Sequence, residues 1–162
     1  MVKPKAFHPE NFIASVFGIG FIPFAPGTWG SLFAAGVYLL LPQSLFEGKG
    51  WWFTGLGLLI FSLFSVWIST LAEKKLGRDA PAIVIDEVCG YFVTVMFLPK
   101  SLMMAIYAFA LFRVFDIAKP FPINVSQRLK GGWGVVVDDL LAGFYANVVI
   151  QFIKLIAPSF FG

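Results

Sequence analysis

Five of the nine acidic residues in the chain lie inside or at the edge of hydrophobic runs. They form two adjacent pairs and one single residue: Asp86 and Glu87 in IVIDEVCGYF, Asp138 and Asp139 in GVVVDDLLAG, and Asp116 in LFRVFDIAKP. Ionisable side chains within apolar helices are energetically costly, and they usually mark a functional site. We therefore take these five carboxylates as the candidate catalytic residues.

The chemistry of these side chains favours a hard metal ion. Several carboxylates held close together cannot all remain ionised unless a cation is present. Oxygen-only ligands suit Mg²⁺ before Ca²⁺ or Mn²⁺, whereas a zinc site needs thiolate or imidazole ligands. The chain has only one cysteine, Cys89, and one histidine, His8. We predict Mg²⁺ at the acidic cluster and interpret Cys89 as a small packing residue.

Basic residues near the acids can bind an anion beside the metal. Arg113 lies three residues before Asp116, on the same helical face and within the apolar run, so we predict a role in the site. Lys119 follows the same run and can also contact an anion. For Arg128 and Lys130 we prefer contact with lipid headgroups, as expected of basic residues beside membrane helices.

The stretch APGTWGS, residues 25–31, is a second candidate anion site. Pro26 and Gly27 favour a turn, and Thr28 or Ser31 can cap the helix that follows. Free N–H groups at the start of a helix bind phosphate well. The same pattern is also typical of an ordinary helix start, so both interpretations stay open.

A metal beside an anion site indicates phosphoryl chemistry. A histidine phosphatase is excluded because His8 is the only histidine, and a Cys-x5-Arg phosphatase is excluded because Val95 stands where arginine is required. The chain also lacks the DxD motif of aspartyl-phosphate enzymes. The remaining mechanism is attack by a water that Mg²⁺ activates, with a carboxylate as a possible base.

The composition predicts the elements that must position these residues. The 162 residues suffice for one domain, 1–162, and are 59% hydrophobic and 13% charged, whereas soluble domains have about 25% charged residues. We expect an all-α, polytopic membrane bundle. About five hydrophobic stretches approach the length of a spanning helix: 29–46, 51–71, 82–98, 101–117 and 134–157. We expect residues 1–10 to form a tail and 11–24 an interfacial or re-entrant segment.

Five crossings would divide the basic residues unequally between the two sides of the membrane. One side would hold nine of them: Lys3, Lys5, Lys74, Lys75, Arg78, Arg113, Lys119, Arg128 and Lys130. The other side would hold three: Lys49, Lys100 and Lys154. The positive-inside rule makes the first side cytoplasmic. In this topology the two acid pairs open the third and fifth helices and Asp116 closes the fourth, so all five carboxylates lie at one depth on the cytoplasmic side.

Helix geometry offers a simpler explanation for part of this pattern. Acidic residues in the first turn of a helix are favoured by the helix dipole and by the free N–H groups there. That effect can account for one of the pairs. It cannot account for Asp116, because a carboxylate is disfavoured at the end of a helix.

The chain resembles the phosphatidylglycerophosphatase A family, a family of Mg²⁺-dependent bacterial membrane lipid phosphatases. The resemblance rests on PFAPGTWGS, on IVIDEVCGYFVTVMFLP, and on FRVFDIAKPFPI followed by GGWGVVVDDLLAG. It implies hydrolysis of phosphatidylglycerophosphate to phosphatidylglycerol and inorganic phosphate at the bacterial cytoplasmic (inner) membrane. The implied partners are this lipid and the membrane, with no nucleic acid.

The same resemblance implies roles for individual residues. The acids of the family correspond to the five carboxylates, of which we expect Asp86, Glu87, Asp116 and Asp139 to hold the metal. Its threonine and basic pair correspond to Thr28, Arg113 and Lys119, which with Gly27 would bind phosphate. Asp79 matches a further acid, and we give it a supporting role.

Three other classes of membrane protein remain as alternatives. A small ion-coupled transporter or channel would use the carboxylates as a cation site, but it predicts acids staggered across the membrane and an internal repeat. A CDP-alcohol phosphotransferase would need spaced aspartates along two helices, with DG and AR elements. A non-catalytic assembly subunit would leave the acidic cluster unexplained.

Overall fold

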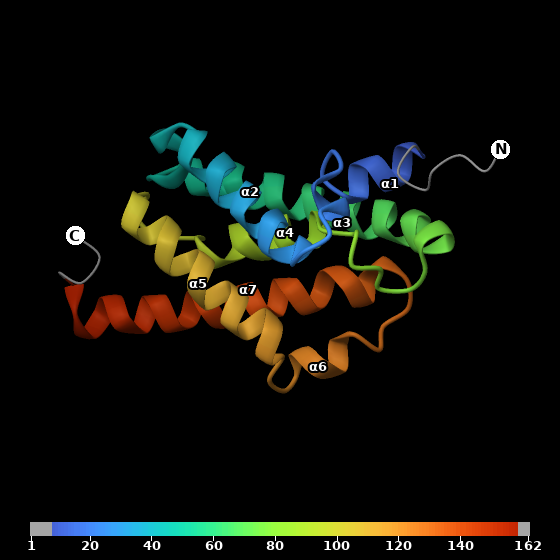
Figure 1. Ribbon diagram of the computed structural model, residues 1–162. Coiled ribbons are helices and arrows are strands. Elements are labelled where there is room, and N and C mark those ends of the chain that lie inside the picture. The colour runs from blue at the N-terminus through green and yellow to red at the C-terminus, as the bar shows by residue number, and fades with distance from the viewer. Residues whose placement is uncertain (1–7, 159–162) are drawn as a thin grey trace.

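The structure, a computed structural model, describes residues 8–158, which form helices and connecting turns with no strand (Figure 1). The α-helices are α1 (Pro9–Ala14), α2 (Pro26–Leu40), α3 (Gly50–Leu76), α4 (Ile85–Thr94), α5 (Leu102–Ala118), α6 (Ile123–Ser126) and α7 (Gly132–Ile156). Two short 3-10 helices are η2 (Ile19–Phe21) and η3 (Gln43–Phe46). The predicted all-α class is therefore confirmed, and the part of the expected tail before residue 8 lies outside the described residues.

Two of the described helices, α3 and α7, are long and apolar enough to span a membrane. The prediction of about five such helices is not confirmed, although a helix overlaps each expected segment. With 15 and 10 residues, α2 and α4 are too short, and α5 with 17 is at the lower limit. Proline explains part of the shortening, because α2 ends before Pro42, and Pro99 follows the turn after α4.

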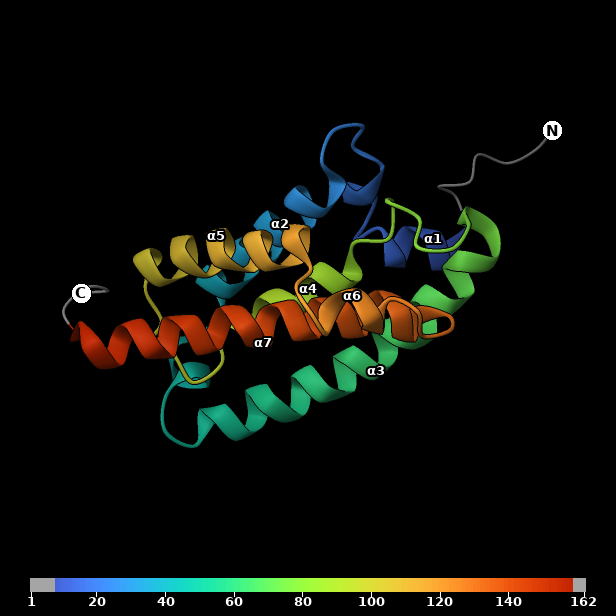
Figure 2. The ribbon, with the colours of Figure 1, turned by 90° about the horizontal axis from the view of Figure 1, so that it is seen from below.

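The helices pack in alternating directions around α4 and α7. In Figure 1, the chain runs along α3 and α5 toward the side that carries the N-terminus and returns along α7 toward the opposite side. Seen from below (Figure 2), α7 lies between α5 and α3. The C-terminal ends of α3 and α5 thus lie on the same side as the beginning of α7.

Small residues let α4 and α7 cross at close range. A methyl group on Gly90 would lie 2.7 Å from the carbonyl oxygen of Asp139 and would also collide with the ring of Phe112. A methyl group on Gly143 would collide with the carbonyl oxygen of Gly90. This crossing places the first turn of α4 beside the second and third turns of α7, where two of the acids lie.

A hydrogen bond from α3 fixes the beginning of α7. The N–H of Gly132 donates to the hydroxyl of Thr70 at 2.9 Å. A side chain at Gly132 would collide with the backbone of Val66, so the two helices touch directly here. The contact sets the register of α7 and therefore the position of its acidic pair.

The far end of α4 is held by a polar side chain of α7. Asn147 Nδ2 donates to the carbonyl oxygens of Thr94 and Met96, at 2.8 and 2.7 Å. Carbonyl groups at the end of a helix have no partner within that helix, and lipid supplies none. Asn147 therefore allows α4 to end inside an apolar bundle.

Large apolar side chains cover the outside of α3. In an apolar stretch of 18 residues in α3, only 33% is buried inside the protein, and the share for the corresponding stretch of α7 is 39%. The core helix of a soluble protein would be mostly buried. The outward side chains of α3 include Trp52, Phe53, Leu56, Leu59, Ile60, Leu63 and Trp67. Such an extensive apolar surface is typical of a protein that contacts lipid.

We expect Asn147→Leu to lower the free energy of unfolding by about 1–3 kcal/mol, the usual cost of leaving buried polar groups without a partner. The measurement is thermal unfolding of the purified protein in detergent. Val148→Leu is the matched control, because Val148 is 48% exposed on the same helix, and exposed substitutions change stability by about 0.5 kcal/mol or less. Equal melting temperatures for the two variants would contradict this role of Asn147.

Candidate metal and phosphate site

All five carboxylates predicted from the sequence lie around one polar cavity of about 310 Å³. Its walls come from the start of α2, the loop before α4, the first turn of α4, the end of α5 and the second and third turns of α7. The charged residues in these walls are Asp79, Asp86, Glu87, Arg113, Asp116, Lys119, Asp138 and Asp139. The cavity thus brings together residues that are up to 114 positions apart in the sequence, from Ala25 to Asp139.

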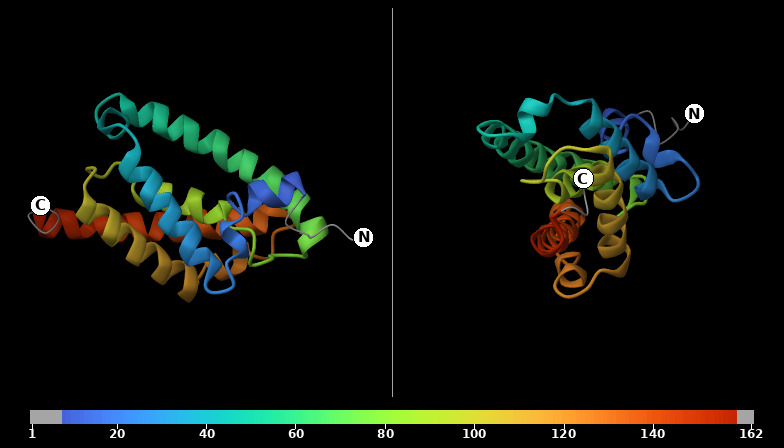
Figure 3. Two further views of the ribbon diagram at one scale, coloured as in Figure 1. Left: turned by 45° about the horizontal axis from the view of Figure 1, so that its top comes forward. Right: turned by 90° about the vertical axis from the view of Figure 1, so that its left-hand side faces the viewer.

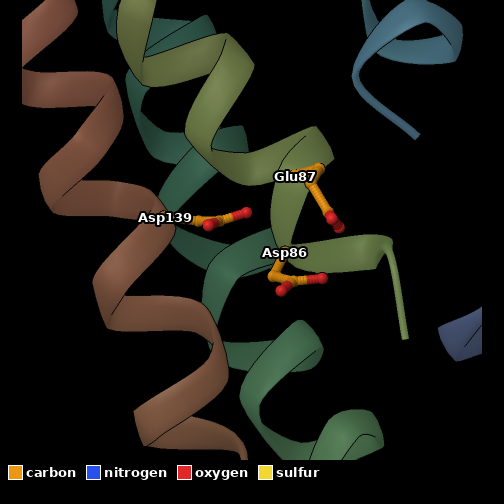
Figure 4. A group of neighbouring side chains, drawn as sticks. All are labelled: Asp86, Glu87 and Asp139. Carbon is orange, nitrogen blue, oxygen red and sulfur yellow. The ribbon is translucent and has the colours of Figure 1, made fainter. Parts of the chain in front are cut away.

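Three of the acids form a compact group within this cavity. Each of Asp86, Glu87 and Asp139 offers one carboxylate oxygen, and these oxygens lie within 4.8 Å of one another. Figure 4 shows the side chain of Asp139, from α7, directed toward the two acids of α4. The residues are only 7%, 9% and 2% exposed, respectively. Carboxylates this close and this well buried repel one another unless a cation or a proton lies between them.

The donor atoms of this group fit a hard cation. Asp86 Oδ1, Glu87 Oε2 and Asp139 Oδ2 are buried and have no hydrogen-bond partner among residues 8–158. Buried polar atoms without a partner are rare and call for a specific explanation. A divalent ion held by these carboxylates would supply the positive charge that the group lacks.

The remaining two acids are paired with basic side chains. Arg113 Nη1 lies 2.5 Å from Asp116 Oδ2, and Lys119 Nζ lies 3.6 Å from Asp116 Oδ1. Lys119 also donates a hydrogen bond to Asp138 Oδ2. Asp116 was expected among the metal ligands, but the structure places it in this ion-pair network rather than in the group of three. The cavity therefore has an uncompensated acidic part and a part that contains basic groups.

The acidic surroundings keep Lys119 charged. Burial by itself lowers the pKa of this ammonium group, but the hydrogen bond to Asp138 and the charges of Asp138 and Asp116 outweigh it. The pKa of Lys119 is therefore above its ordinary value, and the side chain remains a cation at neutral pH. A permanent positive charge in this position is suited to bind an anion.

The start of α2 comes into contact with the acidic group through Gly27. A methyl group here would collide with Glu87 Oε1 and would lie 3.1 Å from Arg113 Nη1. Glycine is thus required for α2 to approach both charged residues. Thr28 is not among the residues that line the cavity, and its N–H donates to the carbonyl oxygen of Ala25 at 2.9 Å.

The predicted capping of α2 by Thr28 or Ser31 is wrong. The N-cap residue is Ala25, which has φ of 48° and makes no side-chain cap. The hydroxyl of Ser31 instead donates to the carbonyl oxygen of Gly27 at 2.8 Å, within the helix. The helix begins earlier than expected because Pro26 has the right φ for the first helical position and has no N–H that needs a partner.

The expectation that Asp138 and Asp139 open a helix is also wrong. The contact between Gly132 and Thr70 makes α7 begin at Gly132, so the pair lies nearly two turns inside it. Helix-end effects fall off within the first turn. They therefore do not explain this pair, although they still apply to Asp86 and Glu87 in the first turn of α4.

Two further residues have different positions relative to the cavity. Asp79 lines it from the loop before α4, where its φ is 49° and its N–H donates to Glu73 Oε1 at 2.8 Å. In the sequence, only the family resemblance singled out Asp79. The thiol of Cys89 is buried and donates to the hydroxyl of Ser65 at 3.2 Å, as expected of a packing residue.

Known proteins resemble the chain over most of its length. The family model described as Phosphatidylglycerophosphatase A matches residues 12–154. Phosphatidylglycerophosphatase A of Haemophilus influenzae is 38% identical over 160 residues, covering 91% of this chain and 90% of that protein. Phosphatidylglycerophosphatase A of Escherichia coli is 33% identical over 155 residues, covering 92% and 86%. A Bacteroides thetaiotaomicron protein provisionally named phosphatidylinositol-3-phosphatase is 37% identical over 156 residues, covering 92% and 95%. No solved structure is significantly similar to the chain.

We expect Asp139→Asn to raise the melting temperature without metal, because the change removes a like charge from the group of three at nearly constant size. In Mg²⁺ the wild-type protein should gain stability, by about 2.7 kcal/mol at a concentration 100 times the dissociation constant, and the variant should gain much less. Thermal unfolding with EDTA and with Mg²⁺ measures both effects.

The matched control for this experiment is Glu47→Gln, since Glu47 is an exposed acid after η3, outside the cavity. The control should keep the full stabilisation by Mg²⁺. If Asp139→Asn kept it as well, Asp139 would not be a metal ligand.

Proposed function

Because the chain belongs to the phosphatidylglycerophosphatase A family, we propose that it hydrolyses phosphatidylglycerophosphate to phosphatidylglycerol and inorganic phosphate. The observation that carries this proposal is the cavity in which Asp86, Glu87 and Asp139 lie beside Arg113 and Lys119, without an ion-pair partner of their own in the described part of the chain. Metal-assisted hydrolysis of a phosphomonoester uses both features, a metal site and positive groups for the phosphoryl oxygens.

The proposed location is the bacterial inner membrane, with the cavity toward the cytoplasm. The long apolar helices α3 and α7 support membrane association. We further propose that α2, α4 and α5 enter the apolar layer beside them. The basic residues at the end of α3, Lys74 and Lys75, lie on the side of the molecule where α5 ends and α7 begins, which supports this orientation.

In the proposed mechanism, Asp86, Glu87 and Asp139 hold Mg²⁺. When bound, the ion would polarise the phosphate and lower the pKa of a bound water. Arg113 and Lys119 would exchange part of their contact with Asp116 and Asp138 for phosphoryl oxygens. Gly27 would allow the phosphate to approach the backbone at the start of α2, and Thr28 in the same turn would assist.

Asp138 is the candidate proton acceptor for the attacking water. Its Oδ2 accepts a hydrogen bond from Lys119, whereas its buried Oδ1 has no partner among the described residues. It lies next to Asp139 in the chain but outside the group of three. Asp138 can therefore receive a proton without giving up a metal contact.

The relatives supply a second candidate substrate. The Bacteroides protein is named for phosphatidylinositol 3-phosphate, which is also a phosphomonoester on a glycerophospholipid headgroup. The same metal and basic groups suit both lipids, and the difference lies in the alcohol that leaves. The alternative of an ion carrier is less well supported, because the five carboxylates share one cavity rather than forming a series across the membrane.

We expect purified protein in detergent to release phosphate from phosphatidylglycerophosphate in Mg²⁺ and to lose this activity in EDTA. Added Mg²⁺ should restore it, because the three carboxylates cannot activate water without the ion. A parallel assay with phosphatidylinositol 3-phosphate gives the ratio of kcat/KM for the two lipids. Full activity in EDTA would contradict the metal mechanism, and a ratio that favours the inositol lipid would change the assigned substrate.

A further inference from the structure

A second cavity, of about 590 Å³, lies between α2, α3 and α4. We call it the apolar groove, because its walls are almost entirely hydrocarbon, including Phe33 and Val37 of α2 and Phe61 of α3. Thr54 is a polar side chain in these walls, and its hydroxyl already donates to the carbonyl oxygen of Leu45 at 2.7 Å. In the left view of Figure 3, α4 is visible between the diverging helices α2 and α3.

The first turns of α4 connect this groove to the carboxylate cavity. Ile85 and Val88 line the groove, whereas Asp86 and Glu87 line the carboxylate cavity. Successive residues on a helix point about 100° apart, so one short segment presents both surfaces. A molecule with a charged end and an apolar end can therefore contact both sites across α4.

The groove also extends away from the carboxylates along α2. Gly27 lines the carboxylate cavity, and Phe33, Val37 and Leu41 line the groove. At a rise of about 1.5 Å per residue, the groove begins roughly 9 Å from Gly27 and continues for about 12 Å to Leu41. It thus leads from the charged site toward the opposite end of the molecule.

We propose that the apolar groove binds one acyl chain of the lipid whose phosphomonoester lies at the carboxylates. This inference rests on the proposed function and specifies how the substrate is held. The volume is within the range of about 300–1,000 Å³ that is usual for ligand sites. A peptide would bring amide groups that these walls cannot satisfy, whereas a hydrocarbon chain needs no polar partner.

Gly57 offers a direct way to fill the groove. It lines the groove from α3, and a methyl group added to it would meet no atom within 4 Å. Gly36 of α2 is the matched control, because it also has open space around an added methyl group but does not line the groove. Both glycines are exposed in helix interiors, so leucine at either position should favour the helix.

We expect Gly57→Leu to lower kcat/KM for a long-chain phosphatidylglycerophosphate about tenfold, a usual effect of a small misfit in a hydrophobic pocket. Most of the change should be in KM. Activity toward a dihexanoyl analogue should be unchanged, and Gly36→Leu should leave both activities unchanged. The proposal is overturned if Gly57→Leu and Gly36→Leu behave alike, or if the long-chain and dihexanoyl substrates are affected equally.

A crosslinking experiment separates failure of this proposal from failure of the proposed function. The probe is phosphatidylglycerophosphate with a diazirine near the end of one acyl chain, and phosphatidylcholine with the same chain is the control for bulk lipid. The first lipid should label residues 53–61 of α3 at least ~5-fold more than the second, because the carboxylate site holds its headgroup, and Gly57→Leu should abolish the excess.

Equal labelling by both lipids would overturn the proposal, even in an active enzyme. Selective labelling without phosphate release would support the acyl-chain site in the apolar groove and contradict the proposed hydrolysis.

Discussion

The repulsion among three buried carboxylates is the constraint on which the rest of the structure depends. Asp86, Glu87 and Asp139 approach within 4.8 Å in an apolar bundle, where like charges interact strongly. Holding them there requires a rigid frame, and the close crossing of α4 and α7 at Gly90 and Gly143 supplies it. A bound cation would relieve the strain of this arrangement, so the same contacts that cost stability would create an affinity for metal.

The ion pairs that Arg113 and Lys119 form with Asp116 and Asp138 would keep phosphate binding separate from metal binding. Arg113 and Lys119 are neutralised by Asp116 and Asp138, so they can remain beside the proposed metal site without filling it. An incoming phosphate can replace part of these contacts without leaving a buried cation unpaired. The arrangement therefore keeps the cavity charged and ordered before the substrate binds, which is the basis of electrostatic preorganisation.

The short helices explain how a charged site and an apolar groove can share one bundle. Because α4 has only 10 residues, both of its ends lie within the protein, and Asn147 supplies partners for the carbonyl groups at its far end. Its near end carries the acids on one face and groove-lining residues on another. A helix that spanned the whole membrane would expose more of its length to lipid and could not be surrounded in this way.

The sequence by itself determined the all-α class, the apolar character, the family, and the set of five acids, because these follow from composition, local periodicity and short motifs. Only the tertiary structure decided which acids stay unpaired and where each helix begins. Asp116 is paired because Arg113 and Lys119 turn toward it, and α7 begins at Gly132 because Thr70 accepts its N–H. Gly27 meets Glu87 across 60 residues of sequence, and Gly90 meets Gly143 across 53. Contacts of this kind depend on how separate helices pack, and local sequence patterns carry little information about that packing.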